Sequence, residues 1–152
     1  MRIFVDADAC PVKREIFRVA ERYGLPVTLV AAAPMRVPEA PWIRMEVVGQ
    51  GFDAADDRIV ERVGRGDIVV TADIPLASRC LAKGARVLGP TGREFTGDNI
   101  GDLLATRDLM AELRGAGMAT GGPPPFTPRD RSLFLQKLDE IVQSLRREAG
   151  SR

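Results

Sequence analysis

Two aspartates separated by one residue stand directly after a short apolar run near the N-terminus. The run is residues 3–5, and Asp6 and Asp8 follow it. An apolar run that precedes an amphipathic segment is typical of a buried parallel strand that ends in a loop. If the backbone stays extended, side chains alternate and both carboxylates lie on one side. Carboxylates are costly to hold against a packed sheet, and a divalent cation is the simplest compensation, so the motif predicts a metal site.

A second apolar run, residues 68–70, also precedes an aspartate, Asp73. Taken alone, Asp73 is better explained as the N-cap of a helix that begins at Pro75. Its expected position next to Asp6 in the sheet favours a metal ligand instead. For Asp6 and Asp8, the alternative is a turn in front of a helix, but two carboxylates exceed what a turn requires.

Further carboxylates lie in the helix predicted over residues 53–63. At about 100° per residue, Asp56 falls inside the apolar stripe of this helix and Asp57 falls near its edge. A carboxylate on the sheet-facing side is either a further metal ligand or part of an N-terminal cap with Asp53, which the helix dipole favours. Both interpretations stay open for Asp56, whereas Asp57 is predicted to cap the helix or to face solvent.

Histidine is absent, and cysteine is limited to Cys10 and Cys80. The absence of histidine excludes Ser-His-Asp and Cys-His catalysis and any zinc site that uses imidazole. Two cysteines also supply neither a thiolate zinc site nor a disulfide framework. Cys10 is predicted at the N-cap of the first helix, where a thiol pKa can fall. A small semi-buried residue is nevertheless the better interpretation of Cys10, and Cys80 is predicted to lie in the core.

Four basic residues line the exposed side of the first predicted helix, and a solvated surface is the default interpretation for them: Lys13, Arg14, Arg18 and Arg22. Lys13 is in the first turn, close to the two aspartates, where an amine can meet a substrate phosphate. Over the whole chain, 22 basic and 21 acidic residues give a formal charge of +1. This balance gives no support for a strong nucleic-acid binder, although it permits a local basic patch.

The chain has 152 residues, of which 45% are apolar and 28% are charged. These values are typical of a single globular domain, here predicted to span residues 1–152. The N-terminus leads directly into a strand without a signal peptide, and no apolar run is long enough to span a bilayer. We therefore expect a cytoplasmic protein with no membrane partner.

Strands and helices are predicted to alternate along the chain. Strands are expected at residues 3–5, 27–32, 44–48, 68–70 and 86–88, with helices near 11–23, 53–63, 75–83 and 99–114. A Gly/Pro-rich loop at 116–127 leads to a C-terminal helix at 128–148, which Thr127 and Asp130 are placed to cap. Residues 150–152 are expected to fray.

This alternation indicates a three-layer α/β fold with a mostly parallel five-stranded sheet and C-terminal helices. Right-handed crossovers favour the strand order 3-2-1-4-5. The topological switch point then lies between the first and fourth strands, at the edge where ligands bind in open α/β sheets. Asp6, Asp8 and Asp73 are expected to meet there.

Five segments together resemble the uncharacterised YaiI/YqxD family of bacterial proteins: VDADACP at 5–11, GFDAAD at 51–56, VTADIPL at 70–76, Arg107-Asp108, and TGGPPPF at 120–126. The resemblance covers nearly the whole chain. The family is grouped with PIN-like domains, many of which are metal-dependent ribonucleases, so the resemblance implies a PIN-like fold and, by analogy alone, a nuclease. The acidic positions of PIN-like nucleases correspond to Asp6, Asp56 and Asp73, with Asp8 as an added candidate. The helix acid is often Glu in those enzymes, and Asp56 is shorter.

These features predict a phosphodiesterase that uses Mg²⁺ or Mn²⁺ and acts on RNA. Asp6 and Asp73 are the expected direct ligands, and Asp8 and Asp56 are expected to complete the shell or to hold its waters. Lys13 is expected to neutralise the substrate phosphate.

Two other functions stay open. The first is a phosphatase of the haloacid-dehalogenase type, with Asp6 as nucleophile and Asp8 as general acid, although that motif normally continues into Thr or Val rather than the Ala-Cys-Pro found at 9–11. The second is a non-catalytic PIN-like module that binds RNA or a protein partner and uses the acidic cluster structurally. The loop at 120–126 is expected to be either a lid near the site or a linker to the last helix.

Overall fold

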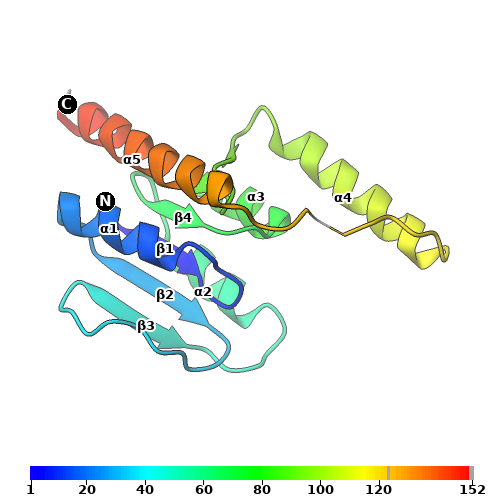
Figure 1. Cartoon of the computed structure of the whole chain (residues 1–152), viewed down its shortest axis with the longest axis horizontal. Coiled ribbons are helices and arrows are strands. Elements are labelled where there is room, and N and C mark those ends of the chain that lie inside the picture. The colour runs from blue at the N-terminus through cyan, green and yellow to red at the C-terminus, as the bar shows by residue number, and fades with distance from the viewer. Residues whose placement is uncertain (123, 151–152) are drawn as a thin grey trace.

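A computed structural model describes residues 1–122 and 124–150. Strands and helices alternate along this part of the chain (Figure 1): β1 (Ile3–Asp6), α1 (Lys13–Tyr23), β2 (Val27–Ala31), β3 (Ile43–Val47), α2 (Ala54–Arg62), β4 (Ile68–Val70), α3 (Ile74–Ala82), β5 (Arg86–Leu88), β6 (Glu94–Phe95), α4 (Ile100–Gly115) and α5 (Pro128–Gly150). Pro123 of the predicted lid or linker, and residues 151–152 of the predicted frayed end, lie outside the described residues.

The strands form one sheet in the order β3-β2-β1-β4-β5-β6. The pairs β1·β2, β2·β3, β1·β4 and β4·β5 are parallel, which confirms the α/β class and the predicted order of five strands. β6 is an additional strand, and it pairs antiparallel with β5. β6 is not predictable from the sequence, because two residues are too few to show an alternating pattern.

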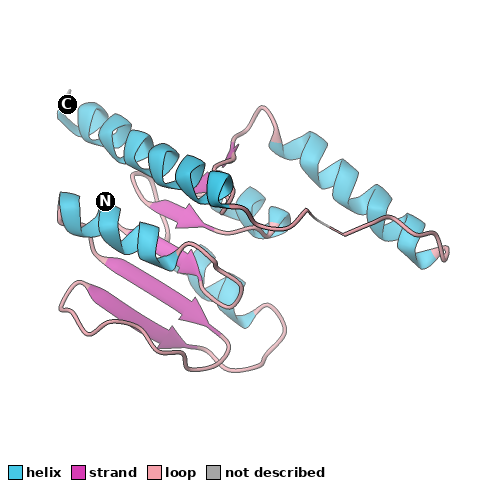
Figure 2. Ribbon diagram, viewed as in Figure 1, coloured by secondary structure: helices cyan, strands magenta, loops and turns pink. Residues whose placement is uncertain are grey.

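Helices cover both faces of the sheet, which is the middle layer of three (Figure 2). On one face, α1 and α5 pack against a cluster that contains Ile3, Val5 and Leu29. On the other face, α2 and α3 pack against a cluster that contains Phe4. Consecutive residues of β1 therefore point to opposite buried faces, which is why the run at 3–5 is apolar at every position. Cys80 of α3 is fully buried in the second cluster, as predicted.

α1 begins later than the sequence predicts. Val12 occupies its N-cap position, and the first helical hydrogen bond runs from the Ile16 N–H to Val12 O at 3.1 Å. Cys10 instead closes the turn after β1, with its N–H donating to Ala7 O at 3.4 Å. The prediction of Cys10 as the N-cap is therefore wrong, because Cys10 belongs to the turn after β1 and the helix begins only after Val12.

α5 begins with the predicted cap. The Thr127 N–H donates to Asp130 Oδ2 at 3.0 Å, and the Asp130 N–H donates to Thr127 Oγ1 at 3.1 Å. This reciprocal pair is a capping box, which satisfies donors that the helix leaves unpaired. The apolar face of the helix is buried, and it consists of Phe134, Leu138, Ile141, Val142 and Leu145. Burial of this face holds α5 against α1 and the sheet.

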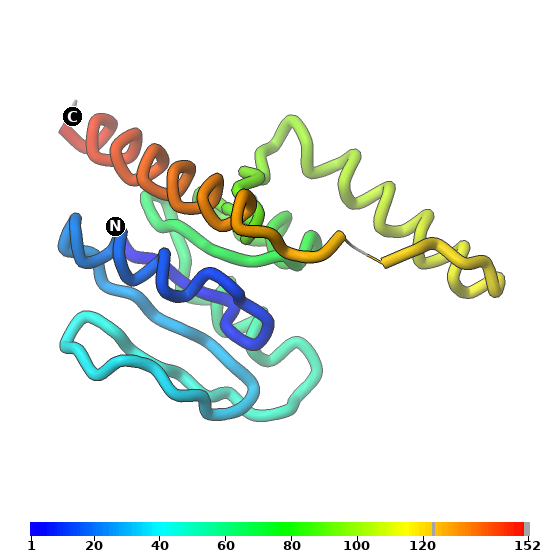
Figure 3. The backbone as a smooth tube through the Cα atoms, in the orientation of Figure 1, coloured from blue at the N-terminus to red at the C-terminus, as the bar shows by residue number. Residues whose placement is uncertain are grey.

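α4 extends away from the sheet, and the chain then returns towards the start of α5 (Figure 3). None of the residues of α4 is buried, and only its first turns, through Ile100 and Leu103, pack against the core. The return segment is the predicted Gly/Pro-rich loop. At its end, the Phe126 ring lies under the Arg131 guanidinium, with 5.0 Å between the guanidinium carbon and the ring centroid. No helix in the described part of the chain combines the length and apolar character needed to cross a membrane.

Candidate functional site

β1 and β4 are neighbours, so the residues that follow them meet at the carboxyl edge of the sheet. Val5 and Val70 are paired in register. Just beyond them, the Thr71 hydroxyl donates to Asp6 Oδ2 at 2.8 Å, and the Asp73 N–H donates to Thr71 Oγ1 at 3.0 Å. Thr71 is only 2% exposed, so this bridge is shielded from water. The fold thus brings Asp6 and Asp73 together at the switch point.

Thr71 is a residue of the site that sequence analysis did not single out. Its signal in the sequence is modest: it is the first polar residue after the buried run at 68–70, two positions before Asp73. A buried hydroxyl needs hydrogen-bond partners, and here the same oxygen donates to a carboxylate and accepts from a backbone N–H. Thr71 therefore fixes the position of Asp6 relative to the start of α3.

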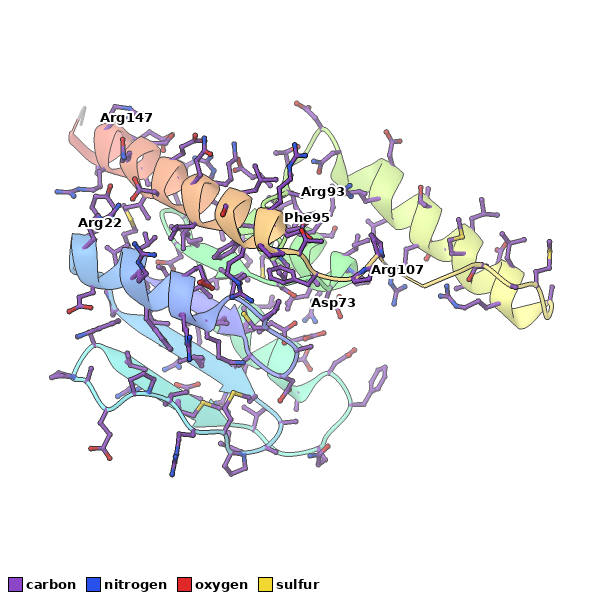
Figure 4. The ribbon with its side chains drawn as sticks, viewed as in Figure 1. Arg22, Asp73, Arg93, Phe95, Arg107 and Arg147 are labelled. Carbon is purple, nitrogen blue, oxygen red and sulfur yellow. The ribbon has the colours of Figure 1, made fainter. Side chains whose placement is uncertain are left out.

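Asp73 has the capping role that its sequence position suggests. Its Oδ1 accepts a hydrogen bond from the Leu76 N–H at 2.9 Å, and Pro75 lies in the first turn of α3. Asp73 is therefore the N-cap of α3. This hydrogen bond engages one carboxylate oxygen. Figure 4 shows Asp73 near the middle of the view, whereas Arg22 and Arg147 lie at its left end.

Asp56 lies half-buried in the first turn of α2. Burial is the main cause that raises its pKa to about 6, and the nearby charges of Asp73, Asp6 and Asp53 raise it further, while Arg79 acts in the opposite direction. Asp53 occupies the N-cap position of α2 with φ +55° and makes no side-chain capping hydrogen bond. Asp53 is therefore the N-cap residue, as the alternative expected, and Asp56 lies in the first turn, but the Asp53 side chain makes no capping hydrogen bond.

Asp57 faces solvent, as predicted. It is exposed, and its Oδ1 accepts a hydrogen bond from Arg79 Nη2 at 2.9 Å. Arg79, whose charge acts on Asp56, is thus paired with Asp57. Within the described residues, no Lys or Arg forms a salt bridge with Asp6, Asp56 or Asp73.

The carboxylate of Asp6 is destabilised by its surroundings. Burial raises its pKa, the hydrogen bond from Thr71 lowers it, and the charges of Asp73 and Asp8 raise it again. Asp6, Asp56 and Asp73 therefore come from three separate elements and repel one another in a partly dry environment. We call these three residues the acidic cluster.

Asp8 points away from this cluster. Both of its oxygens accept from the Ala32 N–H, at 3.2 and 3.0 Å, at the end of β2. The expectation that Asp6 and Asp8 lie on one side required extended backbone, and residues 8–9 form a turn instead. The condition for a shared side is therefore not met: Asp8 accepts hydrogen bonds at the end of β2, whereas Asp6 accepts one from Thr71, which follows β4 on the other side of β1.

Cys10 and Lys13 lie beside the cluster. Burial raises the pKa of the Cys10 thiol, which favours the neutral form and agrees with a semi-buried residue without nucleophilic chemistry. Lys13 is half-buried, and its Nζ donates to Cys10 O at 3.0 Å. A small hollow of about 30 Å³, enough for one water, is lined by Asp6, Ala9, Cys10, Val70, Thr71, Ala72 and Pro90.

The donor set of the acidic cluster consists of carboxylate oxygens, which Mg²⁺ and Mn²⁺ prefer. As the side chains stand, no three Asp, Glu, Cys or His residues of the described part of the chain converge closely enough to hold a metal ion. The hydrogen bonds of Asp6 and Asp73 each leave one carboxylate oxygen for another partner. The residue types fit a hard divalent cation, and binding requires these side chains to move closer together.

The fold and site define an α/β protein with carboxylates from three elements at the switch point of a mostly parallel sheet. The sequence profile described as "Uncharacterized BCR, YaiI/YqxD family" matches residues 4–144. The chain therefore belongs to the YaiI/YqxD family, as its motifs indicate.

Curated relatives match over nearly their whole lengths. A UPF0178 protein of Rhodopseudomonas palustris (strain HaA2) is 59% identical over 150 residues, which are 99% of this chain and 92% of the relative. A UPF0178 protein from Nitrobacter winogradskyi is 55% identical over 152 residues, which are 100% of this chain and 97% of the relative. Another from Paramagnetospirillum magneticum is 58% identical over 146 residues, which are 96% of this chain and 97% of the relative. No solved structure matches the chain, so the PIN-like grouping stays a prediction.

Proposed function

We propose that this protein is a phosphodiesterase that uses Mg²⁺ or Mn²⁺ and hydrolyses RNA. The observation that carries the proposal is the gathering of Asp6, Asp56 and Asp73 at one edge of the sheet, where burial and then the neighbouring acidic charges raise the pKa of Asp56 to about 6 even though Arg79 opposes the shift. Carboxylates held together in this way gain stability when a cation binds between them. The choice of RNA rests on the analogy between the family and PIN-like ribonucleases.

Asp6 and Asp73 are the proposed direct ligands. Each uses one oxygen in a hydrogen bond, with Thr71 and with the Leu76 N–H respectively, and has a second oxygen to offer. Asp56 accepts no hydrogen bond within the described residues, so we assign it to complete the shell or to hold its waters. Asp8 has the weakest support, because both of its oxygens already accept from Ala32.

A bound Mg²⁺ or Mn²⁺ would polarise the phosphoryl oxygen and lower the pKa of the attacking water. Thr71 is proposed as a positioning residue that keeps the carboxylate of Asp6 at the edge of the sheet. Lys13 is proposed to neutralise charge on the substrate phosphate, since its amine lies at the Cys10 carbonyl beside the cluster. A bound cation would lower the pKa of Asp56, because a positive charge opposes the effect of its acidic neighbours, so binding below about pH 6 would release a proton.

The test is cleavage of single-stranded RNA by purified protein. We expect cleavage with Mn²⁺ that EDTA abolishes, and loss of cleavage in Asp6→Asn and in Asp73→Asn. Asp57→Asn is the matched control, because Asp57 is an exposed carboxylate of the same helix as Asp56 and pairs with Arg79. Absence of cleavage by pure protein with Mn²⁺ would contradict the proposal and favour a non-catalytic module.

The phosphatase alternative has less support from the geometry. It requires Asp8 to act as a general acid next to Asp6, whereas both oxygens of Asp8 accept from the Ala32 N–H on the opposite side of β1. A general acid must reach the leaving group by a hydrogen bond. A phosphoaspartyl intermediate trapped on Asp6 would nevertheless favour the phosphatase over the phosphodiesterase.

A further inference from the structure

A basic groove lies beside the acidic cluster, and of its lining residues only Lys13 has a role in the chemistry described above. It has a volume of about 500 Å³ and is lined by Cys10, Pro11, Lys13, Arg14, Glu15 and Arg131. Cys10 also lines the small hollow that contains Asp6 and Thr71. The groove therefore adjoins the hollow beside Asp6 at Cys10, and we call it the α1–α5 groove.

Contacts between α1 and α5 hold the walls of the α1–α5 groove in place. Arg131 Nη1 donates to Pro11 O at 2.9 Å and to Glu15 Oε1 at 2.8 Å. Glu15 is 7% exposed, so it is a buried counter-charge for Arg131 rather than a group that faces the solvent. On the other side, Phe126 packs against the same guanidinium. The groove is therefore a built feature of the fold.

The net charge of the α1–α5 groove is positive. Lys13, Arg14 and Arg131 line it, and the one lining anion, Glu15, already pairs with Arg131. Arg14 is exposed, and it makes no ion pair within the described part of the chain. Its guanidinium is thus available for a ligand, and guanidinium groups bind phosphate with paired N–H donors.

We propose that the α1–α5 groove binds a phosphate of the substrate strand next to the one that lies at the acidic cluster. The inference rests on the proposed function and names its substrate more closely: a single-stranded polynucleotide rather than a mononucleotide or other small phosphodiester. A small substrate needs only the acidic cluster and Lys13. A strand needs a positive track for its neighbouring phosphates, often with an aromatic ring nearby for a base.

Arg14 is the residue that tests the proposal, because it is exposed and forms no hydrogen bond or ion pair with residues 1–122 or 124–150. Binding of a labelled single-stranded RNA of about 12 nucleotides, a length within the usual span of such sites, is measured by fluorescence anisotropy in EDTA. We expect Arg14→Gln to weaken binding about tenfold, as for the loss of one charged hydrogen bond. The slope of log K against log salt should fall by about 0.7, the value for one phosphate contact on a single strand.

Arg18→Gln is the matched control. Arg18 is an exposed arginine one turn further along α1 that does not line the α1–α5 groove, so its loss should leave both the affinity and the salt slope unchanged. Equal affinities for Arg14→Gln and wild type, with equal thermal midpoints, would overturn the proposal. Displacement of the RNA by inorganic phosphate at a concentration equal to that of the RNA would also overturn the proposal, because the groove would then be a site for a lone anion.

Because EDTA removes metal from the assay, this result does not depend on cleavage. Binding that depends on Arg14, in a protein that never cleaves RNA with Mn²⁺, would keep the groove and reject the phosphodiesterase. Cleavage that depends on Asp6 but not on Arg14 would keep the phosphodiesterase and reject the groove.

Discussion

The Thr71 hydroxyl donates a 2.8 Å hydrogen bond to the carboxylate of Asp6, although the two residues are 65 positions apart in the sequence. The bond joins the ends of β1 and β4, and it lowers the pKa of Asp6 against the effect of burial. One threonine therefore contributes both to the stability of the sheet edge and to the charge state of the acidic cluster.

Replacing Thr71 with valine should destabilise the protein. The change removes the donor to Asp6 and the acceptor of the Asp73 N–H, and leaves both groups partly buried. We expect a loss of about 1–3 kcal/mol in the free energy of unfolding, which is the usual cost of buried groups left unpaired. Urea denaturation measures this loss. Thr71→Ser keeps the hydroxyl and should recover most of the stability; equal losses in the two variants would show that the methyl group matters instead.

Asp56 should make stability depend on pH. Its pKa in the folded protein is about 6, above the ordinary value of 3.8, so the folded state binds this proton more tightly than the unfolded state does. The stability that Asp56 gains from this proton is fully present below pH 3.8 and is lost as the pH rises through about 6. Since Asp56 is only half-buried, solvent screening reduces the effect to about 1 kcal/mol.

Thermal melting over this pH range compares Asp56→Asn with wild type. The variant should lack this part of the pH dependence. The melting temperature of the variant minus that of wild type should therefore be larger above pH 6 than in acid. Asp57→Asn, which removes an exposed carboxylate of the same helix, should follow the wild-type profile in shape. Parallel profiles for wild type and Asp56→Asn would mean that the raised pKa of Asp56 does not contribute to stability.

Manganese should stabilise the wild-type protein through the acidic cluster. A ligand that binds only the folded state stabilises it by about 2.7 kcal/mol at 100 times its dissociation constant. The gain in melting temperature should be larger well above pH 6 than below it, because Asp56 is then charged before the cation binds. Asp6→Asn should abolish the gain and Asp57→Asn should keep it. A gain that survives Asp6→Asn would place the ion elsewhere.

Two substitutions of Asp73 separate its capping role from its proposed ligand role. Asparagine caps helices as well as aspartate does, so Asp73→Asn should keep the hydrogen bond with the Leu76 N–H and nearly full stability, while RNA cleavage is lost. Asp73→Ala should lose cleavage and also about 1 kcal/mol of stability. Chemical denaturation and a cleavage assay on the same samples test both statements. Cleavage by Asp73→Asn at the wild-type rate would leave Asp73 with the cap as its only role.

The main features of the fold were predictable because they follow from local patterns. Strands buried on both faces are apolar at every position, and the runs at 3–5 and 68–70 show this directly. Thr127 and Asp130 predict the start of α5 because a capping box uses residues three positions apart. The two-residue strand β6 has no such pattern, since its pairing with β5 comes from the tertiary fold.

The sequence by itself determined which acids stand at strand ends, and therefore that Asp6 and Asp73 meet once β1 and β4 pair. Only the tertiary structure decided that Asp8 turns to Ala32 and that Thr71 bridges Asp6 to α3. Alternation along a strand predicts where a side chain points only while the backbone stays extended. Here the backbone turns at residues 8–9. Beyond that turn, hydrogen bonds with segments distant in the sequence decide the direction of each carboxylate.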